Sequence, residues 1–233
     1  MKHFTSIVLI IFTSFIGLSQ TYEVGAILGG ANLIGDVGST TYISPNTLAF
    51  GVIGKWNRSS RHAFRFSIIS AKVKGDDADS HETRREERGY TFDNNITEIS
   101  AGLEYSFWEF DTYSARTVYT PYLFTGINYF LYEAAWIRPG TGEFFKYKGG
   151  RSISIPMVIG FKAMIAPQFT MGFEIGARYT FVDDIDGSNT TSNSEAQNNE
   201  DFKFGNLNNN DWYVFTTVYI NFTFGRKPCY CNF

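Results

Sequence analysis

The sequence is poor in the residues on which many catalytic and metal-binding sites depend. It contains three histidines in 233 residues, His3, His62 and His81, and they are too scattered to suggest a metal cluster. It contains two cysteines, Cys229 and Cys231, both in the last few residues. We therefore expect no metal site and no cofactor.

Charge and long apolar runs are also scarce. Charged residues make up 18% of the chain and the net charge is -3, so there is no basic footprint for nucleic acid. Mean hydropathy is -0.16, and no apolar run of spanning length follows the first twenty residues. These values exclude a helical membrane protein. They are compatible with a β-barrel, in which inward polar residues dilute the lipid-facing ones.

The N-terminus has the pattern of an export signal. Lys2 and His3 precede the apolar run 7–16, and small residues follow in 17–19. A transmembrane anchor is the alternative, but this apolar core is short for spanning a bilayer. We predict a signal peptide over residues 1–19, cleaved just before Gln20. No cysteine follows the signal, which argues against a lipoprotein.

Eight later segments alternate between apolar and polar side chains, the period of a strand with two different faces. In the last one, Val214, Val218 and Phe222 share one face, while Thr217 and Asn221 share the other. The segments are 22–30, 48–56, 63–73, 96–107, 118–132, 152–164, 169–181 and 212–224. Their length and even number predict an all-β fold, an eight-stranded antiparallel transmembrane β-barrel over residues 20–225.

The connections between these segments alternate in length. Those after the first, third, fifth and seventh segments are long and polar: 32–47, 74–95, 133–151 and 182–211. The other three, 57–61, 108–117 and 166–168, are shorter. This pattern predicts a barrel in the outer membrane, with both termini periplasmic and the long loops extracellular.

Aromatic residues recur near both ends of the segments, as expected for rings at a membrane interface. Trp56 and Trp108 fall at the predicted periplasmic ends, and Phe130, Trp136 and Trp212 at the predicted outer ends. A soluble β-sandwich is the main rival. It would explain the alternation but not aromatic residues at both ends.

Eight charged residues occupy predicted inward positions, four acidic and four basic. They are Glu23, Lys55, Arg65, Glu98, Glu104, Lys162, Glu174 and Arg178. A proton or ion path, or a pair of catalytic carboxylates, is one interpretation. The other is a salt-bridge plug, because side chains fill a barrel of this size and buried charges need partners. The balanced signs favour the plug, with Glu98, Glu104, Lys162, Glu174 and Arg178 as its members.

Three charged segments fall in the predicted outer loops. The acidic segments 76–79 and 183–187 raise the question of calcium, but their spacing does not match a known calcium loop, and we expect solvated loops. Segment 81–88, HETRREER, has balanced signs and predicts either a solvated loop or a loop-to-loop contact. Since His62 and His81 are expected on opposite sides of the membrane, no nucleophile constellation emerges and we predict no enzyme.

The tail 226–233 extends beyond the last predicted strand. Pro228 prevents further strand pairing. Cys229 and Cys231 allow three interpretations: a strained local disulfide, a metal site that lacks further nearby ligands, or an intermolecular contact. We predict a periplasmic interaction segment that contains Arg226, Lys227, Cys229, Tyr230 and Cys231.

Several longer motifs resemble one family, the PorG-type outer-membrane barrels of the type IX secretion system. The motifs are LGGANLIGDVGSTTYISPN (28–46), KWNRSSRHAFRFS (55–67), DADS (77–80) with RGYTFDNNITEIS (88–100), GFEIGARYTFVDDIDG (172–187), FGNLNNNDWYVF (204–215) and GRKPCYCNF (225–233). The resemblance covers essentially the whole mature chain, apart from the low-complexity stretch 188–200. It implies a non-enzymatic barrel that docks onto a periplasmic ring of PorK and PorN.

Two functions therefore remain open. The first is a component of the type IX secretion machinery, which docks through periplasmic turns and the tail and has no small-molecule substrate. The second is a stand-alone outer-membrane barrel that acts as a porin or an adhesin through its external loops.

Overall fold

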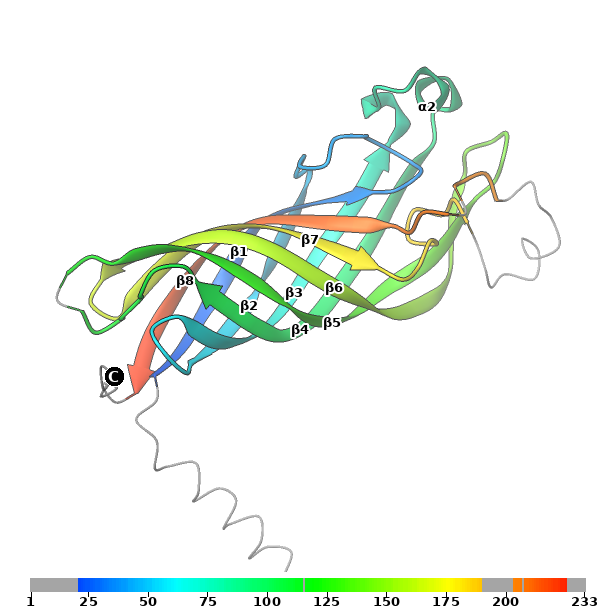
Figure 1. Cartoon of the computed structure of the whole chain (residues 1–233). Helices are drawn as coiled ribbons and strands as arrows, with labels where there is room; N and C mark the ends of the chain where they lie inside the picture. The colour runs from blue at the N-terminus through cyan, green and yellow to red at the C-terminus, as the bar shows by residue number, and fades with distance from the viewer. Residues whose placement is uncertain (1–20, 115, 190–202, 207, 226–233) are drawn as a thin grey trace, which may run out of the picture.

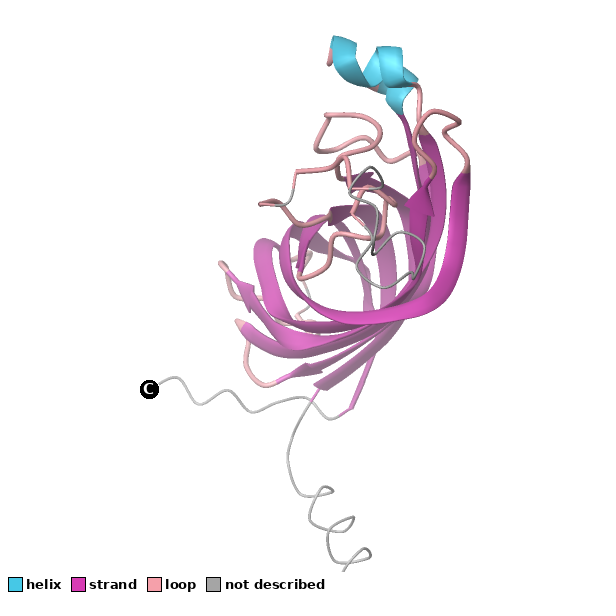
Figure 2. Cartoon of the chain, turned by 90° about the vertical axis from the view of Figure 1, so that its right-hand side faces the viewer, coloured by secondary structure: helices cyan, strands magenta, loops and turns pink. Residues whose placement is uncertain are grey.

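The computed structural model describes residues 21–114, 116–189, 203–206 and 208–225, and these form one closed antiparallel barrel (Figures 1 and 2). The eight strands are β1 (Thr21–Ile34), β2 (Thr47–Asn57), β3 (His62–Asp76), β4 (Thr91–Ser106), β5 (Tyr119–Ile137), β6 (Phe144–Ala166), β7 (Phe169–Thr180) and β8 (Trp212–Gly225). Each strand pairs with its sequence neighbours, and β1 closes the ring by pairing with β8 from Thr21↔Gly225 to Ile34↔Trp212. The predicted fold class is confirmed.

Alternation along each strand separates an interior from an apolar outer wall. On β7, Phe169, Met171 and Phe173 are exposed, whereas Thr170 and Glu174, at alternate positions, are buried. A side chain points to opposite faces at successive positions, so this sequence can bury its polar set only by turning it into the barrel. Figure 1 shows the strands tilted across the barrel, with the turns gathered at its two ends.

Interior tyrosines fit against glycines on the neighbouring strands. An ideal Cβ on Gly160 would lie 2.4 Å from the ring of Tyr122, and one on Gly172 would lie 2.3 Å from the ring of Tyr219. Both distances are shorter than any ordinary carbon contact. The glycines therefore provide the space that lets these large side chains fill the interior.

The two ends of the barrel differ. The short-turn end carries the connections 58–61, 107–118 and 167–168, and the long-loop end carries 35–46, 77–90, 138–143 and 181–211. The 3₁₀ turn η2 (Asp77–Asp79) and the helix α2 (Thr83–Arg88) lie in the second of these long loops. Figure 2 shows loops gathered over one opening of the ring. No helix within the described residues is long and apolar enough to cross a membrane.

Two sequence-based expectations about the long-loop end were wrong. The connection expected over 133–151 is only 138–143, because β5 and β6 continue as a paired hairpin as far as Ile137↔Phe144. The aromatic residues Phe130 and Trp136, expected at the outer interface, are buried at 0% and 5% exposure. Trp136 stacks on Phe145 with 4.7 Å between ring centroids. The hairpin lacks simple alternation because its register shifts between Ala134 and Ala135 and because Ala135 and Ile137 donate backbone hydrogen bonds to the loop 181–211, so the expected strands ended too early.

Candidate functional site

The barrel interior contains the largest concentration of charged side chains, and the strand register explains how they meet. Glu23, Lys55 and Arg65 stand directly opposite one another on β1, β2 and β3. They share the inward face, and all three are at most 3% exposed. The register thus places one acid and two bases side by side across three strands before any long-range contact is made.

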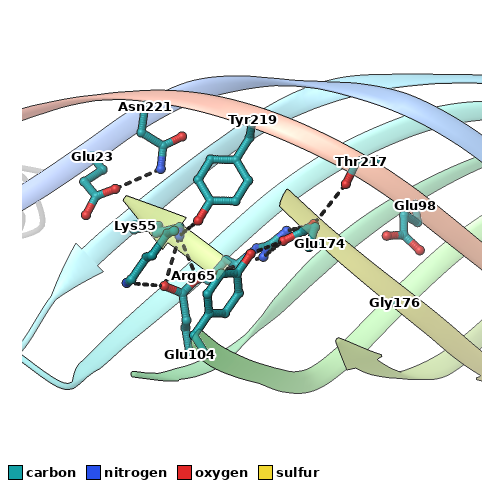
Figure 3. Close-up of polar contacts among 12 residues, drawn as sticks. Glu23, Lys55, Arg65, Glu98, Glu104, Glu174, Gly176, Thr217, Tyr219 and Asn221 are labelled. Carbon is teal, nitrogen blue, oxygen red and sulfur yellow. Dashed lines mark hydrogen bonds and ion pairs between the residues drawn. The ribbon is translucent and has the colours of Figure 1, made fainter. Parts of the chain in front are cut away.

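Glu104 on β4 is the centre of a first cluster (Figure 3). Its carboxylate oxygens lie 2.7 Å from Lys55 Nζ and 2.7 Å from Lys162 Nζ, and Arg65 Nη1 is 4.0 Å away. Lys55 also donates a hydrogen bond to the hydroxyl of Tyr219, at 3.0 Å. One carboxylate therefore holds cations from three strands.

Glu174 on β7 is the centre of a second cluster. Arg65 donates two parallel hydrogen bonds to its two oxygens, at 2.6 and 2.8 Å. The Tyr122 hydroxyl donates to it at 2.6 Å and the Thr217 hydroxyl at 3.3 Å. The guanidinium of Arg65 also lies over the ring of Phe124, 4.6 Å from its centroid. Bidentate pairing to a fully enclosed arginine is among the strongest polar contacts a protein forms.

The other two interior acids are also satisfied. Glu98 accepts hydrogen bonds from Arg178 at 2.9 Å, Tyr213 at 2.8 Å and Asn128 at 3.1 Å. Glu23 accepts from the amides of Asn57 and Asn221, at 2.7 and 2.8 Å. Glu98 and Glu104 are 0% exposed, so solvent does not reach either side chain from the two openings of the barrel. The charged layer closes the barrel.

The five side chains expected to form a plug thus all lie inside. Lys162 pairs with Glu104, Arg178 pairs with Glu98, and Glu174 takes its cation from Arg65. The sequence reasoning missed the neutral partners, chiefly Tyr122, Asn128 and Asn221. The sequence did contain a signal for them. Each occupies an inward position in the alternation, where a buried polar side chain needs a hydrogen-bond partner.

The short-turn end is covered by the connection 107–118. Phe110 is buried at 6% exposure, and Lys162 Nζ lies 4.6 Å from the centre of its ring. The backbone amide of Phe110 donates to the carbonyl of Ser60 in the neighbouring turn, at 2.9 Å. The hydroxyl of Tyr113 donates to the carbonyl of Gly225, at 2.7 Å. This connection therefore contacts the last described residue before the tail.

At the long-loop end, Asp77 joins two loops. Its two oxygens accept from the backbone amides of Gly38 and Tyr90, at 2.8 and 3.0 Å, and from the guanidinium of Arg88, at 2.7 and 3.0 Å. Asp77 is 0% exposed, so the solvated loop expected over 76–79 is wrong at this residue. Buried carboxylates that accept backbone N–H groups order loops in place of a regular ladder.

Segment 81–88 makes the loop-to-loop contact that was one of its two expected interpretations. It contains α2, from which Arg85 donates to the carbonyls of Gly35 and Gly38, at 3.0 and 3.3 Å. Arg88 lies over the ring of Phe204, 4.9 Å from its centroid. The loops 35–46, 77–90 and 181–211 are thus connected into one cap.

The acidic segment 183–187 is the second place where an expected solvated loop is wrong. Asp186 is 0% exposed and accepts from the amides of Asp36 and Val37, at 2.7 and 3.1 Å. Asp211 is 1% exposed and accepts from the amide of Ile185, at 2.9 Å. Both carboxylates therefore connect segments of the cap, as Asp77 does.

Burial and neighbouring carboxylates change how these acids titrate. Burial, followed by the charge of nearby Asp186, raises the pKa of Asp183 to about 7. Burial also raises the pKa of Asp184 and that of Asp186, and it raises the pKa of Asp211 well above the usual value. Among the residues that the structure describes, no three acidic, histidine or cysteine side chains are arranged to hold a metal ion.

The predicted interaction residues of the tail, Arg226, Lys227, Cys229, Tyr230 and Cys231, lie outside the described residues, as does the predicted signal peptide 1–19. The structure therefore leaves the three interpretations of the cysteines as they stood.

Comparison with known proteins gives a family and several similar folds. Neisserial surface protein A has 12% identity and a TM-score of 0.45, over 88% of this chain and 97% of that one. The N-terminal β-barrel domain of Pseudomonas aeruginosa OprF has 10% identity and a TM-score of 0.44, over 89% and 98%. A major outer membrane protein from Thermus thermophilus has 13% identity and a TM-score of 0.43, over 88% and 100%. No curated protein matches the chain.

The family model described as "Domain of unknown function (DUF6089)" matches residues 2–233, which is nearly the whole chain. The chain belongs to the DUF6089 family.

Proposed function

We propose that this protein is a non-enzymatic outer-membrane barrel that works as a docking component and not as a channel. The observation that carries the proposal is the closed interior, where Glu98 and Glu104 are fully buried among cationic partners. A barrel filled in this way offers neither an aqueous path nor a substrate cavity at that level. Its working surfaces are then the wall and the two ends.

The apolar outer wall supports placement in a membrane. Large side chains such as Phe66, Ile127 and Ile159 are 50%, 66% and 61% exposed on three different strands. Soluble proteins rarely expose contiguous apolar area on this scale. In a bilayer the same side chains face lipid, and the closed ring leaves no strand edge unpaired. We place both termini in the periplasm and the long loops outside, because outer-membrane barrels have short turns on the periplasmic side and longer loops on the extracellular side.

The more specific proposal is a PorG-type role in type IX secretion, with the short turns and the tail docking onto a ring of PorK and PorN. It rests on the resemblance of the motifs described above. The geometry of the short-turn end is compatible with it, since Tyr113 of the connection 107–118 contacts Gly225, the residue that precedes the tail in the sequence.

A co-purification experiment tests this role. The protein is extracted from outer membranes under non-reducing conditions, and the proteins that co-purify with it are identified. Deletion of residues 226–233 should abolish co-purification of the ring proteins while the barrel stays folded and heat-modifiable on gels. Deletion of residues 192–199, a segment of equal length in the connection between β7 and β8, is the matched control and should change nothing. Retained co-purification without the tail would remove the tail from the mechanism.

The second candidate is a stand-alone barrel that acts through its external loops. The observation in its favour is the ordered cap, in which Asp77, Arg88 and Asp186 join three loops into one surface. Loops of this kind on a rigid barrel are suited to binding. Binding of an external ligand that is lost when the cap is disrupted would support this candidate, as would a conductance above leak in planar bilayers. A barrel without conductance above leak counts against a pore.

A further inference from the structure

The hairpin of β5 and β6 extends beyond the neighbouring strand β7 at the long-loop end (Figure 1). β6 pairs with β7 only as far as Ser154↔Thr180, whereas its pairing with β5 continues to Ile137↔Phe144. Within the described residues, the first part of β6 therefore has a neighbouring strand on one side only.

On the opposite edge of the same hairpin, the backbone of β5 has partners. The amide of Glu133 donates to the side chain of Asn94, at 3.0 Å. The amides of Ala135 and Ile137 donate to carbonyls of the loop 181–211, at 3.2 Å each. These residues of β5 thus direct their backbone groups away from β6. In an antiparallel ladder, two opposite residues that do not bond each other direct their backbone groups to opposite sides.

The register then identifies the backbone groups on the open side of β6. Gly149 is opposite Glu133, and Arg151 is opposite Leu131, two positions earlier on β5. The amides and carbonyls of Gly149 and Arg151 therefore point away from β5, at a level where β7 has already ended. Both residues are exposed, and within the described chain no hydrogen bond joins their backbone to another segment. A Cβ on Gly149 would meet no atom within 4 Å, so the space beside it is open.

An open strand edge specifies the kind of molecule that covers it. It presents donors and acceptors at the spacing of a β-ladder, which another extended strand satisfies best. Such a row of unpaired groups is incompatible with the hydrocarbon layer, where no water replaces the missing partners. The exposed large apolar side chains of β6 end at Ile153, which is 51% exposed. We therefore place the edge in water, beyond the lipid-facing wall and accessible to other proteins.

We propose that this edge of β6, residues 148–152, binds an extended segment of another polypeptide as an added antiparallel strand, with an acidic side chain of the partner opposite Arg151. Arg151 forms no ion pair within the described residues, and Glu133, the acid diagonal to it on the same face, is paired with Lys146 at 2.9 Å. Lys148, opposite buried Ala134, lies on the other face. A second copy of this chain fits less well, because it would bring the same bases together and like charges across strands are unfavourable.

This surface lies at the long-loop end, separate from the short turns and the tail, and so goes beyond the docking role proposed above. The probe is a short fluorescent peptide of alternating threonine and valine with a central glutamate. It is titrated with the full-length barrel in neutral detergent micelles, and binding is followed by fluorescence anisotropy. Opposite Arg151, the glutamate would direct its own amide toward β6. N-methylation of that amide should weaken binding about tenfold, whereas N-methylation of the adjacent valine amide, which points away, should change it little.

Three substitutions test the same edge from the side of the protein. G149P removes an amide that faces the partner and none that pairs with β5, and proline is tolerated on edge strands. It should weaken binding about tenfold, whereas G149A keeps the amide and should bind like the wild type. R151Q should weaken binding roughly threefold, as expected for an exposed ion pair. Heat-modifiable gel mobility checks that each variant is folded, and the peptide pair keeps the test valid if G149P is not.

Equal binding by G149P and G149A, or equal effects of the two N-methylations, would refute the added strand. Two further results would refute a separate partner. Peptide binding that appears only after residues 192–199 are deleted would show that the chain covers its own edge, and dimers that G149P dissociates would show a second copy there. Deletion of the tail 226–233 should leave peptide binding unchanged, so this test and the test of ring docking fail independently.

Discussion

The substitution E104Q offers a direct test of the closed interior. Glutamine keeps the size of the side chain but removes the negative charge that pairs with Lys55 and Lys162 and lies 4.0 Å from Arg65. Those cations are at most 3% exposed, so solvent does not compensate for the loss. Removing one partner of a buried ion pair costs about 3–5 kcal/mol, because the remaining charge is left enclosed. We expect E104Q to lower the free energy of unfolding by that amount.

The measurement is urea unfolding of the barrel in lipid vesicles, followed by tryptophan fluorescence and by heat-modifiable gel mobility. The control is E109Q, since Glu109 forms the exposed ion pair with Arg61 at 3.7 Å, its side chain 73% exposed. Exposed pairs of this kind are worth about 0–1 kcal/mol. The two Glu→Gln changes should therefore differ by several kcal/mol although their chemistry is identical.

A second substitution separates charge imbalance from loss of shape. K162M removes one of the cations that face Glu104 while keeping an unbranched chain. In the double variant E104Q/K162M the number of buried charges is again balanced, so it should recover a large part of the stability lost in E104Q. A double-mutant cycle gives the coupling directly. A free energy of unfolding for E104Q within about 1 kcal/mol of the wild-type value would refute the closed salt-bridge network. So would a double variant that recovers none of the lost stability.

Three further outcomes follow from other parts of the molecule. G160A should destabilise the barrel by about 1–3 kcal/mol in urea unfolding, because a methyl group there collides with a buried tyrosine ring, whereas G149A, with open space around it, should change stability little. D77N leaves Arg88 without its carboxylate and should lower the free energy of opening the cap by about 1–3 kcal/mol. Proteolysis within residues 77–90 should then be faster, while the free energy of unfolding of the barrel stays unchanged. With the pKa of Asp183 raised to about 7, the folded loop binds more protons than the open loop between about pH 4 and pH 7, so its stability falls as pH rises through that range. Amide exchange at residues 183–189 should be slower at pH 5 than at pH 8 after correction for intrinsic rates, and D183N should reduce the difference, leaving the part due to Asp184, Asp186 and Asp211.

The strands and the interior could be predicted because both follow from a period of two. Glu98, Glu104 and Arg178 could be assigned to the inside by counting from exposed apolar neighbours, with no knowledge of their partners. Counting does not say which acid meets which base. The partners of Glu174 come from β3, β5 and β8, and those distances depend on how far each strand is staggered around the ring. The stagger between strands is fixed only when the whole barrel closes, so no single segment of the sequence reveals it.

The cap could not be predicted for a different physical reason. Asp77 and Asp186 are acidic residues in polar segments, and such residues are usually solvated. Their burial results from backbone amides of a distant loop, those of Gly38 and Val37, which a sequence pattern does not mark as donors. The prediction for the β5–β6 hairpin failed for a similar reason, since Ala135 and Ile137 donate to carbonyls of the distant loop 181–211 and the register shifts beside them. Contacts between loops follow no regular spacing along the sequence, so a periodic pattern cannot predict them.

The distribution of charge explains why function should be sought on the surface of this barrel. Inside, four acids and four bases are matched to one another or to amides, so the interior has no charge left for a ligand. In the cap, the buried carboxylates are committed to backbone amides and to Arg88. What remains is the outer wall and the exposed parts of the two ends, where side chains such as Ile127 and Ile159 reach the surroundings.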